Sequence, residues 1–296
     1  MTSFAVLLLS AAAVVAQPSR VRAPYNGAIA VDARSGAVLM SDRADQECYQ
    51  ASCTKLMTVF LVLESFERGE VTLSDLVPTT PESARELPSL SGMRHPDSMS
   101  LDNLLKVLMV KSGNDAAVMV AQYVASKTHP EITDGPGRLA AFVADMNRTA
   151  AALGMTNTVF VTPNGMPPPR NSKRGFDRST AADMAKLAVA LLKKHPEVLG
   201  YTSLKNCSVT SAKGDRFEYT NHNNLLVGSR KDPSVRLPGV DGLKTGYHNA
   251  GGLSVVVTAS ERGKRAIVVV LGSPSARDRD RAARRILTDA LGYLDL

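Results

Sequence analysis

The chain has 296 residues, of which 44% are hydrophobic and 21% are charged, and its formal net charge is +7. This composition is ordinary for a soluble globular protein and excludes a disordered chain, a collagen-like rod and a multi-span membrane protein. A basic protein can bind nucleic acid, anionic lipid or an acidic polymer. Aromatic residues make up only 5% and tryptophan is absent, so a base-stacking surface for nucleic acid is not expected.

Residues 4–16 form an apolar run that is too short for an ordinary transmembrane helix. Val14 and Ala16 stand at the −3 and −1 positions of a cleavage site before Gln17. We interpret residues 1–16 as a secretory signal peptide, the alternative being a buried N-terminal helix or strand. Export would place the mature chain in the periplasm or elsewhere in the cell envelope, outside the cytoplasm.

Strand-like patterns lie at both ends of the chain, and helical patterns lie between them. Predicted strands cover residues 27–42, with a turn at 34–36, and the hairpin 253–259 and 265–271. Predicted helices cover about 54–68, 101–111, a segment from about 114, 138–153, 179–194 with Ser179 as N-cap, and about 278–291. The first of these helices is apolar nearly all round, which is typical of a buried central helix. The order predicts an α/β (α+β) fold whose antiparallel sheet is closed by distant segments.

The first chemical motif is Ser52-Cys53-Thr54-Lys55, at the start of the predicted buried helix. The S-x-x-K pattern is expected roughly once by chance in such a chain, so its position carries the argument. Residues three apart on a helix share a face, which places the Ser52 hydroxyl beside the Lys55 amine. The helix dipole disfavours an ammonium in the first turn, and burial also lowers the pKa of a lysine. A neutral Lys55 could then deprotonate Ser52.

The second motif is Ser112-Gly113-Asn114, at the break between two helical patterns. The functional interpretation gives Ser112 a part in proton relay and gives Asn114 an amide that contacts the substrate backbone. The alternative is that Ser112 ends one helix and Asn114 caps the next, since helix capping by these residue types is common.

The third motif is Lys244-Thr245-Gly246, just before the predicted strand at 253–259. An exact K-T-G is expected well under once by chance. Lys244 supplies a cation, Thr245 supplies a hydroxyl, and Gly246 lets a substrate approach the backbone closely, a combination that suits a carboxylate. A second cation near Lys55 would lower its pKa further. The alternative is a turn that leads into a strand.

Class A β-lactamases and penicillin-binding proteins carry S-x-x-K, S-D-N and K-T-G in this order. Here the middle motif is S-G-N rather than S-D-N, which counts against a β-lactamase. The sequence resembles the serine D-alanyl-D-alanine carboxypeptidases, the low-molecular-mass penicillin-binding proteins of bacteria. Further stretches that resemble this family extend over about residues 27–291: AIAVDARSGAVLMSDRAD, ASCTKLMTVFLVLE, VKSGNDAAVMVA, GMTNTVFVTPNG, STAADMAKLA and GVDGLKTGYHNAGG.

The resemblance implies a β-lactamase/transpeptidase-like fold, in which helices flank the antiparallel sheet. It implies a catalytic domain over residues 24–296, with a mainly helical subdomain inserted at about 75–195. The β-rich C-terminal domain and the amphipathic membrane anchor of many relatives are not expected in this chain.

The resemblance also implies acyl transfer to Ser52 from a peptidoglycan stem peptide that ends in D-Ala-D-Ala. Lys55 would take the Ser52 proton, the backbone N–H groups of Ser52 and Tyr247 would form the oxyanion hole, and Ser112 would pass a proton to the leaving D-alanine. The substrate-binding residues would be Asn114, Lys244, Thr245, Gly246, Tyr247 and Arg279. Of these, Lys244, Thr245 and Arg279 would hold the terminal carboxylate. β-Lactams would acylate Ser52 as covalent inhibitors. No cofactor and no metal are expected.

Other functions remain as alternatives. A class A β-lactamase needs a Glu between the second and third motifs to activate water, and the sequence offers no convincing E-x-x-x-N there. A D,D-endopeptidase that cuts cross-links would use the same motifs. A non-catalytic module for nucleic acid or wall polymer would rely on the arginines of 277–285, but Asp278 and Asp280 interrupt them, so we interpret this run as a solvated helix face and expect no nucleic-acid partner.

The chain departs from the family in two places. Cys53 follows the expected nucleophile where an aliphatic residue is usual, so thiol reagents could affect activity. We interpret Cys53 itself as a small buried residue rather than a nucleophile. Residues 87–100 match the family loosely, so the rim of the cleft is not predicted.

Overall fold

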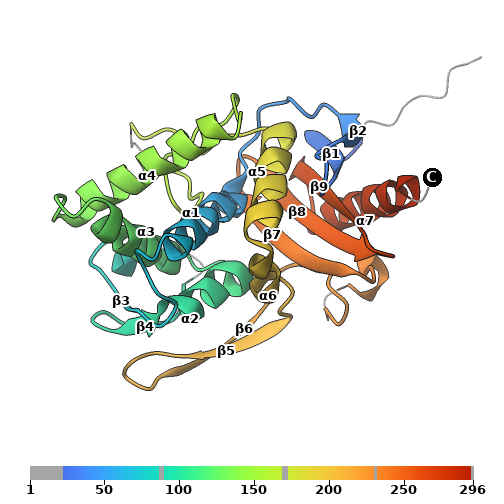
Figure 1. Cartoon of the computed structure of the whole chain (residues 1–296). Helices are drawn as coiled ribbons and strands as arrows, with labels where there is room; N and C mark the ends of the chain where they lie inside the picture. The colour runs from blue at the N-terminus through green and yellow to red at the C-terminus, as the bar shows by residue number, and fades with distance from the viewer. Residues whose placement is uncertain (1–22, 87–89, 169–172, 230–231, 295–296) are drawn as a thin grey trace, which may run out of the picture.

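The computed structural model describes residues 23–86, 90–168, 173–229 and 232–294. The central sheet has five strands (Figure 1), which are β1 (Gly27–Asp32), β2 (Val38–Asp42), β7 (Val240–His248), β8 (Gly252–Glu261) and β9 (Lys264–Ser273). Their order is β2-β1-β9-β8-β7, and each neighbouring pair is antiparallel. The pairing of β1 with β9 confirms the predicted closure of the sheet by distant segments. The predicted signal peptide lies outside the described residues.

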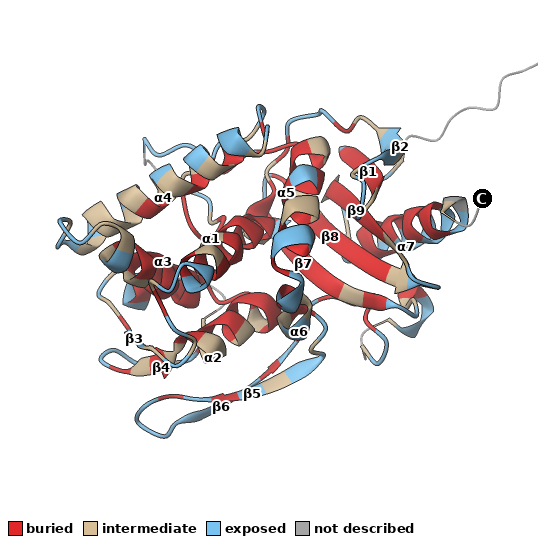
Figure 2. Ribbon diagram, in the orientation of Figure 1, coloured by how far each residue is buried: buried red, intermediate tan, exposed pale blue. Residues whose placement is uncertain are grey.

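The central strands are apolar on both faces because helices cover both. In β9, Val268 and Val270 face one hydrophobic cluster, whereas Ile267 and Val269 face the other. This alternation follows from the two-residue repeat of a strand, and it explains why β8 and β9 are continuous apolar runs in sequence. Figure 2 shows the buried strands enclosed between helices.

Helices form the two outer layers. α7 (Ala276–Tyr293) packs on one face of the sheet, whereas α1 (Lys55–Glu67) and α5 (Ala181–Lys194) lie on the other (Figure 1). α1 is buried among α3, α4 and α5, as its apolar circumference predicts. The other helices are α2 (Leu101–Lys106), a π-helical segment (Val107–Lys111), α3 (Asn114–Thr128), α4 (Gly135–Ala152) and α6 (Leu199–Thr202), with 3-10 turns at Ala51–Thr54, Ser83–Arg85, Pro196–Val198 and Pro233–Val235. Two small hairpins pair β3 (Leu76–Pro78) with β4 (Ser98–Ser100) and β5 (Asn206–Thr210) with β6 (Arg216–Thr220).

One local prediction and one alternative differ from the structure, and one hairpin was not predicted. The N-cap of α5 is Thr180, whose side chain accepts from the N–H of Asp183, rather than Ser179. The K-T-G segment is not a turn that leads into a strand, because it lies inside β7. The β5–β6 hairpin was not predicted, since most of its residues are exposed and polar and therefore give no apolar alternation.

Within the described ranges, none of the helices has an apolar stretch of the length that a membrane crossing requires.

The packing of α7 on the sheet predicts a large stability effect. Leu287 is fully buried in this interface, so Leu287→Ala should lower the free energy of unfolding by about 2–5 kcal/mol. The matched control is Leu76→Ala in β3, where the side chain is 60% exposed and the change should stay within about 0.5 kcal/mol. Equal losses for the two variants in denaturant unfolding would contradict this packing.

Candidate active site

Ser52 and Lys55 lie at the junction where a 3-10 turn (Ala51–Thr54) runs into α1. The turn begins at Ala51, whose φ of 51° is in the left-handed region. This geometry places Lys55 Nζ 3.0 Å from Ser52 Oγ. The Ser52 hydroxyl and the Lys55 amine are therefore neighbours, as predicted, but a 3-10 turn at the start of the helix brings them together.

The Lys55 amine is fully buried and has two further partners. Its Nζ donates to Asn114 Oδ1 at 2.8 Å and to the backbone carbonyl of Asn164 at 2.7 Å. Both partners are oxygens that only accept. A neutral amine has two N–H groups, which these oxygens take up, and the lone pair is then left for the hydroxyl of Ser52. The arrangement suits a base that removes the Ser52 proton.

Burial and a neighbouring cation both lower the pKa of Lys55. Desolvation is the largest cause and the positive charge of Lys244 is the second, while Glu86 raises it in opposition. The pKa of Lys55 lies well below its ordinary value as a result. The direction agrees with the sequence prediction of an uncharged amine.

Ser112 and Asn114 are placed by the break between α2 and α3. The π-helical segment Val107–Lys111 ends at Ser112, whose φ of 63° is left-handed. A Cβ at Gly113 would lie 2.7 Å from Val107 Cγ1, so the sharp turn needs glycine. Asn114 then begins α3, where its amide oxygen accepts from Lys55. We predicted a contact between Asn114 and the substrate, and the structure adds this second contact to the lysine.

The third motif lies on β7, which is the edge strand of the sheet beside the 3-10 turn of Ser52. A Cβ at Gly246 would lie 2.7 Å from the backbone oxygen of Gln50, so only glycine allows this approach. Lys244 is buried, and desolvation together with the charge of Arg279 lowers its pKa to about 8. Thr245 is also buried, whereas the Tyr247 side chain is 65% exposed.

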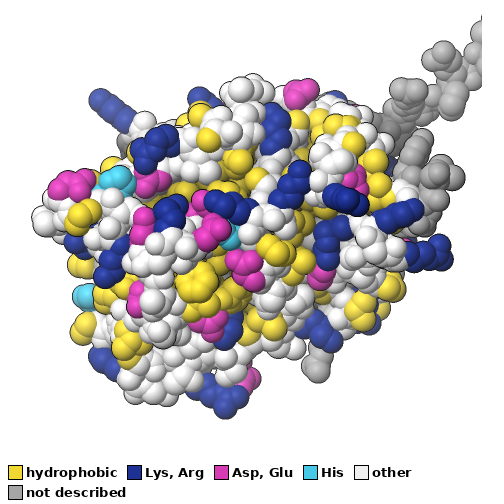
Figure 3. Space-filling view, in the orientation of Figure 1, with side chains coloured by type: hydrophobic (Ala, Val, Ile, Leu, Met, Phe, Trp, Pro, Cys, Tyr) yellow, Lys and Arg dark blue, Asp and Glu magenta, His cyan; other side chains and the backbone are white. Residues whose placement is uncertain are grey.

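Arg279 lies in the first turns of α7, close enough for its charge to lower the pKa of Lys244. Its guanidinium is buried and forms an ion pair with Asp280 at 2.6 Å. This pair also reduces the basic character of the 277–285 run. Across the face drawn in Figure 3, Lys and Arg are interspersed with Asp and Glu, a pattern that does not favour a nucleic-acid surface.

One segment of the site has no counterpart among the predicted residues. The loop 162–166 supplies the Asn164 carbonyl, and Thr58 Oγ1 of α1 donates to the Pro163 carbonyl at 2.5 Å. The Asp177 carboxylate accepts from the hydroxyl and N–H of Thr162 and holds the loop from the other side. The sequence contains this segment as a family-like stretch, but no local pattern connects it to Lys55.

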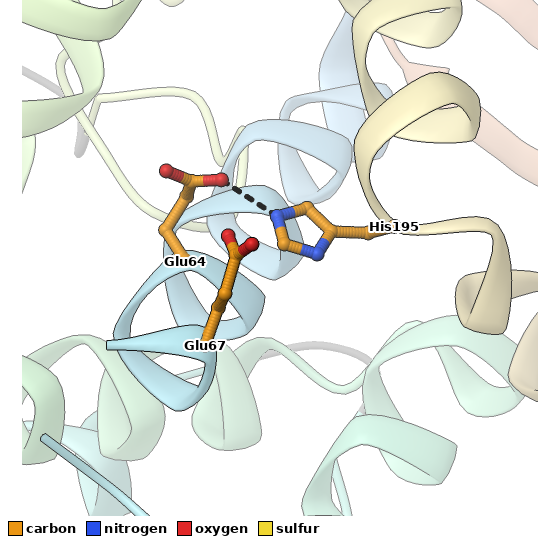
Figure 4. Close-up of side chains that lie close together, drawn as sticks. All are labelled: Glu64, Glu67 and His195. Carbon is orange, nitrogen blue, oxygen red and sulfur yellow. Dashed lines mark hydrogen bonds and ion pairs between the residues drawn. The ribbon is translucent and has the colours of Figure 1, made fainter. Parts of the chain in front are cut away.

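A group of side chains that combines carboxylates with an imidazole lies away from Ser52. Glu64, Glu67 and His195 come close together where α1 meets α5 (Figure 4). His195 Nε2 lies 2.6 Å from Glu64, and the Lys194 ammonium lies 2.6 Å from Glu64 and 3.4 Å from Glu67. A metal ion would have to displace this ammonium, so we interpret the group as an ion-pair network that ties α5 to α1.

The chain belongs to the D-alanyl-D-alanine carboxypeptidase family, whose model matches residues 12–275. It is 32% identical to D-alanyl-D-alanine carboxypeptidase DacC of Escherichia coli over 96% of this chain and 66% of that protein. It is 28% identical to DacF of Bacillus subtilis over 90% of this chain and 62% of that protein. The chain therefore spans less than two thirds of the length of these curated relatives.

The fold is that of the penicillin-binding proteins. A solved penicillin-binding protein of Listeria monocytogenes, in its cefotaxime-bound form, aligns with a TM-score of 0.75 and 29% identity over 93% of this chain and all of that one. This likeness confirms the predicted transpeptidase-like fold. The roles of individual residues in this chain follow from the geometry above and are proposed below.

The environment of Cys53 corrects the expected thiol sensitivity. Its side chain is fully buried, its thiol lies 3.6 Å from the Lys244 carbonyl, and desolvation raises its pKa to about 11. At pH 8 such a thiol is ionised to only about 1 part in 1000, and the thiolate is the reactive form.

We therefore predict that iodoacetamide at pH 8 modifies Cys207, which is partly exposed, long before Cys53. Peptide mass mapping at increasing times measures the order. Both residues should react in denaturant, which serves as the control. Modification of Cys53 in the folded protein at the rate of Cys207 would contradict its burial.

Proposed function

We propose that this protein is a serine D-Ala-D-Ala carboxypeptidase that removes the terminal D-alanine of peptidoglycan stem peptides. The observation that carries the proposal is the buried Lys55 amine, which donates to two oxygens and lies 3.0 Å from Ser52 Oγ. Membership of the D-alanyl-D-alanine carboxypeptidase family supplies the substrate class. A D,D-endopeptidase and a β-lactamase would share this geometry, but no observation favours either.

Acylation begins when Lys55 Nζ takes the proton of Ser52. The Ser52 oxygen attacks the carbonyl carbon between the two D-alanines, and negative charge develops on the carbonyl oxygen. The backbone N–H groups of Ser52 and Tyr247 form the oxyanion hole. Such preorganised donors lower the barrier because they need no reorientation as the charge appears.

The substrate binds as an extended segment along β7. This strand is an edge of the sheet, so it can pair with one further strand. Lys244 and Thr245 hold the terminal carboxylate, and the buried Arg279 adds positive charge behind them. The peptide upstream of the scissile bond then continues past Tyr247, and Asn114 contacts its backbone.

Breakdown of the tetrahedral intermediate releases D-alanine. Ser112 relays to the leaving nitrogen the proton that Lys55 took from Ser52, the C–N bond breaks, and an acyl ester remains on Ser52. Water hydrolyses this ester and restores the Ser52 hydroxyl. β-Lactams enter the same path as covalent inhibitors, and the cefotaxime-bound form of the Listeria relative supports binding of a β-lactam. None of the proposed steps requires a cofactor or a metal.

Three broader assignments belong to the same proposal. Residues 1–16 act as a signal peptide, so the enzyme works in the periplasm or elsewhere in the cell envelope. Residues 24–296 form the catalytic domain, into which a mainly helical subdomain is inserted at about 75–195.

Replacing the nucleophile tests the function directly. Ser52→Ala should abolish covalent labelling by penicillin and the release of D-alanine from a pentapeptide ending in D-Ala-D-Ala, because no hydroxyl remains to be acylated. The matched control is Ser203→Ala at an exposed position outside the site, which should keep both activities. Mass spectrometry locates the adduct. Labelling that persists in Ser52→Ala would overturn the assignment of the nucleophile.

The pKa of Lys244 predicts an alkaline limit to acylation. Its pKa is lowered to about 8, so the cation that holds the carboxylate is present below this pH and is lost above it. The acylation rate should therefore fall as the pH rises through about 8. Lys244→Arg should remove this limb because a guanidinium stays charged, whatever its effect on the maximal rate.

Stopped-flow measurement of penicillin acylation between about pH 5 and 10.5 records the alkaline limb and, at lower pH, the acid limb expected where the proposed base Lys55 becomes protonated. Lys213→Arg, at an exposed position in the β5–β6 turn, is the control and should keep the alkaline limb. An unchanged alkaline limb in Lys244→Arg would show that another group titrates there.

A further inference from the structure

The Asn164 carbonyl takes up one of the two N–H groups of a neutral Lys55, so its position matters for the base. Asn164 is nearly fully buried, and its side chain is fixed at both ends. Its Oδ1 accepts from the N–H of Met166 at 3.0 Å, and its Nδ2 donates to Glu86 Oε2 at 2.9 Å. Asn164 thus links Glu86 to Lys55, because its side chain contacts the carboxylate and its carbonyl contacts the amine.

Glu86 comes from an unexpected part of the chain. It follows the 3-10 turn Ser83–Arg85 and precedes Asn164 by 78 residues. It lies before the second motif, whereas the Glu of a class A β-lactamase that activates water lies between the second and third motifs. No motif in the sequence indicates it.

The charge of Glu86 also acts on Lys55. Among the groups around the amine, Lys244 lowers the pKa of Lys55, and Glu86 gives the largest opposing effect, ahead of Cys53 and Asp177. Around Glu86 itself, burial and Asp115 raise the pKa of its carboxyl, whereas Asn164, Arg174 and Lys55 lower it. The net direction is upward, with burial as the largest cause.

Asp177 does not duplicate this arrangement. Its carboxylate accepts from the N–H of Val161 and from the N–H and hydroxyl of Thr162, so it anchors the beginning of the loop. Glu86 instead holds the side chain of the residue whose carbonyl contacts Lys55. The two carboxylates therefore fix different points of one loop.

We propose that Glu86 is a positioning residue for acyl transfer, which holds the Asn164 carbonyl against Lys55 and adjusts the charge state of that amine through its own negative charge. The inference rests on the proposed function, since it assigns Lys55 as the base. It adds a carboxylate to the site that neither the motifs nor the family match assigns.

Two variants separate the charge from the hydrogen bond. In Glu86→Gln the amide oxygen still accepts from Asn164, but the negative charge is lost. The pKa of Lys55 should then fall, and the acid limb of the acylation profile should move to lower pH by on the order of one unit. In Asn164→Ala the charge of Glu86 and the backbone carbonyl remain, but their connection is cut. Acylation should slow about tenfold or more because the carbonyl is no longer held.

The measurement is the pH profile of Ser52 acylation by labelled penicillin, followed by stopped flow, with thermal unfolding to confirm that each variant folds. Glu82→Gln is the matched control, because Glu82 lies four residues earlier and accepts from Gln122 of α3. Its profile should coincide with that of the wild type. Glu86→Asp retains the charge and should keep the acid limb nearer its wild-type position than Glu86→Gln does.

Several outcomes would overturn the inference. If the acid limb of Glu86→Gln coincides with that of the wild type, the charge of Glu86 does not act on Lys55. If the acylation rate of Asn164→Ala is unchanged, the Asn164 side chain does not position the carbonyl. Normal acylation with accumulation of the acyl-enzyme in Glu86→Gln would make Glu86 a base for the hydrolytic water instead. If wild-type protein forms no penicillin adduct, the proposed function itself fails, which distinguishes that case from the others.

Discussion

The site depends on keeping a primary amine uncharged inside the protein. Burying an ammonium without a counter-ion is costly, so the environment of Lys55 favours the neutral form. The fold supplies three conditions for this: full burial in α1, a second cation on β7, and oxygen acceptors for the two N–H groups. The lone pair is then directed to Ser52, which is the only remaining polar contact described for Nζ.

These conditions explain why the sheet is closed by distant segments. α1 follows directly on β1 and β2, whereas the second cation lies on β7 near the other end of the chain. Pairing of β1 with β9 brings the two parts together, and the close approach at Gly246 sets β7 against the turn of Ser52. The helical block between them contributes Asn114 and the 162–166 loop. The surroundings of the Lys55 amine are therefore assembled from four regions of the sequence.

The sequence predicted the local contacts and the closure of the sheet by distant segments, but not the contacts between loops that surround Lys55. Ser52 and Lys55 were predictable because a three-residue spacing on a helical turn determines their neighbourhood. β7 was missed because Gly242 and Gly246 weaken the apolar alternation of a strand. Glu86 and Asn164 are 78 residues apart and carry no shared pattern, so only the folded chain reveals their contact.

Lys55 and Lys244 are two buried lysines of the site with different proposed roles, the first as the base and the second as the cation for the carboxylate. Both are fully buried, and burial is the largest cause of the lowered pKa in each. They differ in the neighbouring cation that lowers the pKa further. Burial is the largest cause for Lys244 and repulsion by Arg279 adds to it, so its pKa falls to about 8 and it stays charged at neutral pH. Lys55 is repelled by Lys244, so the cation proposed to bind the carboxylate also lowers the pKa of the proposed base. A change that neutralised Lys244 would therefore raise the pKa of Lys55, and under the proposed roles it would weaken substrate binding at the same time. The proposed mechanism thus couples recognition of the carboxylate to proton transfer at Ser52.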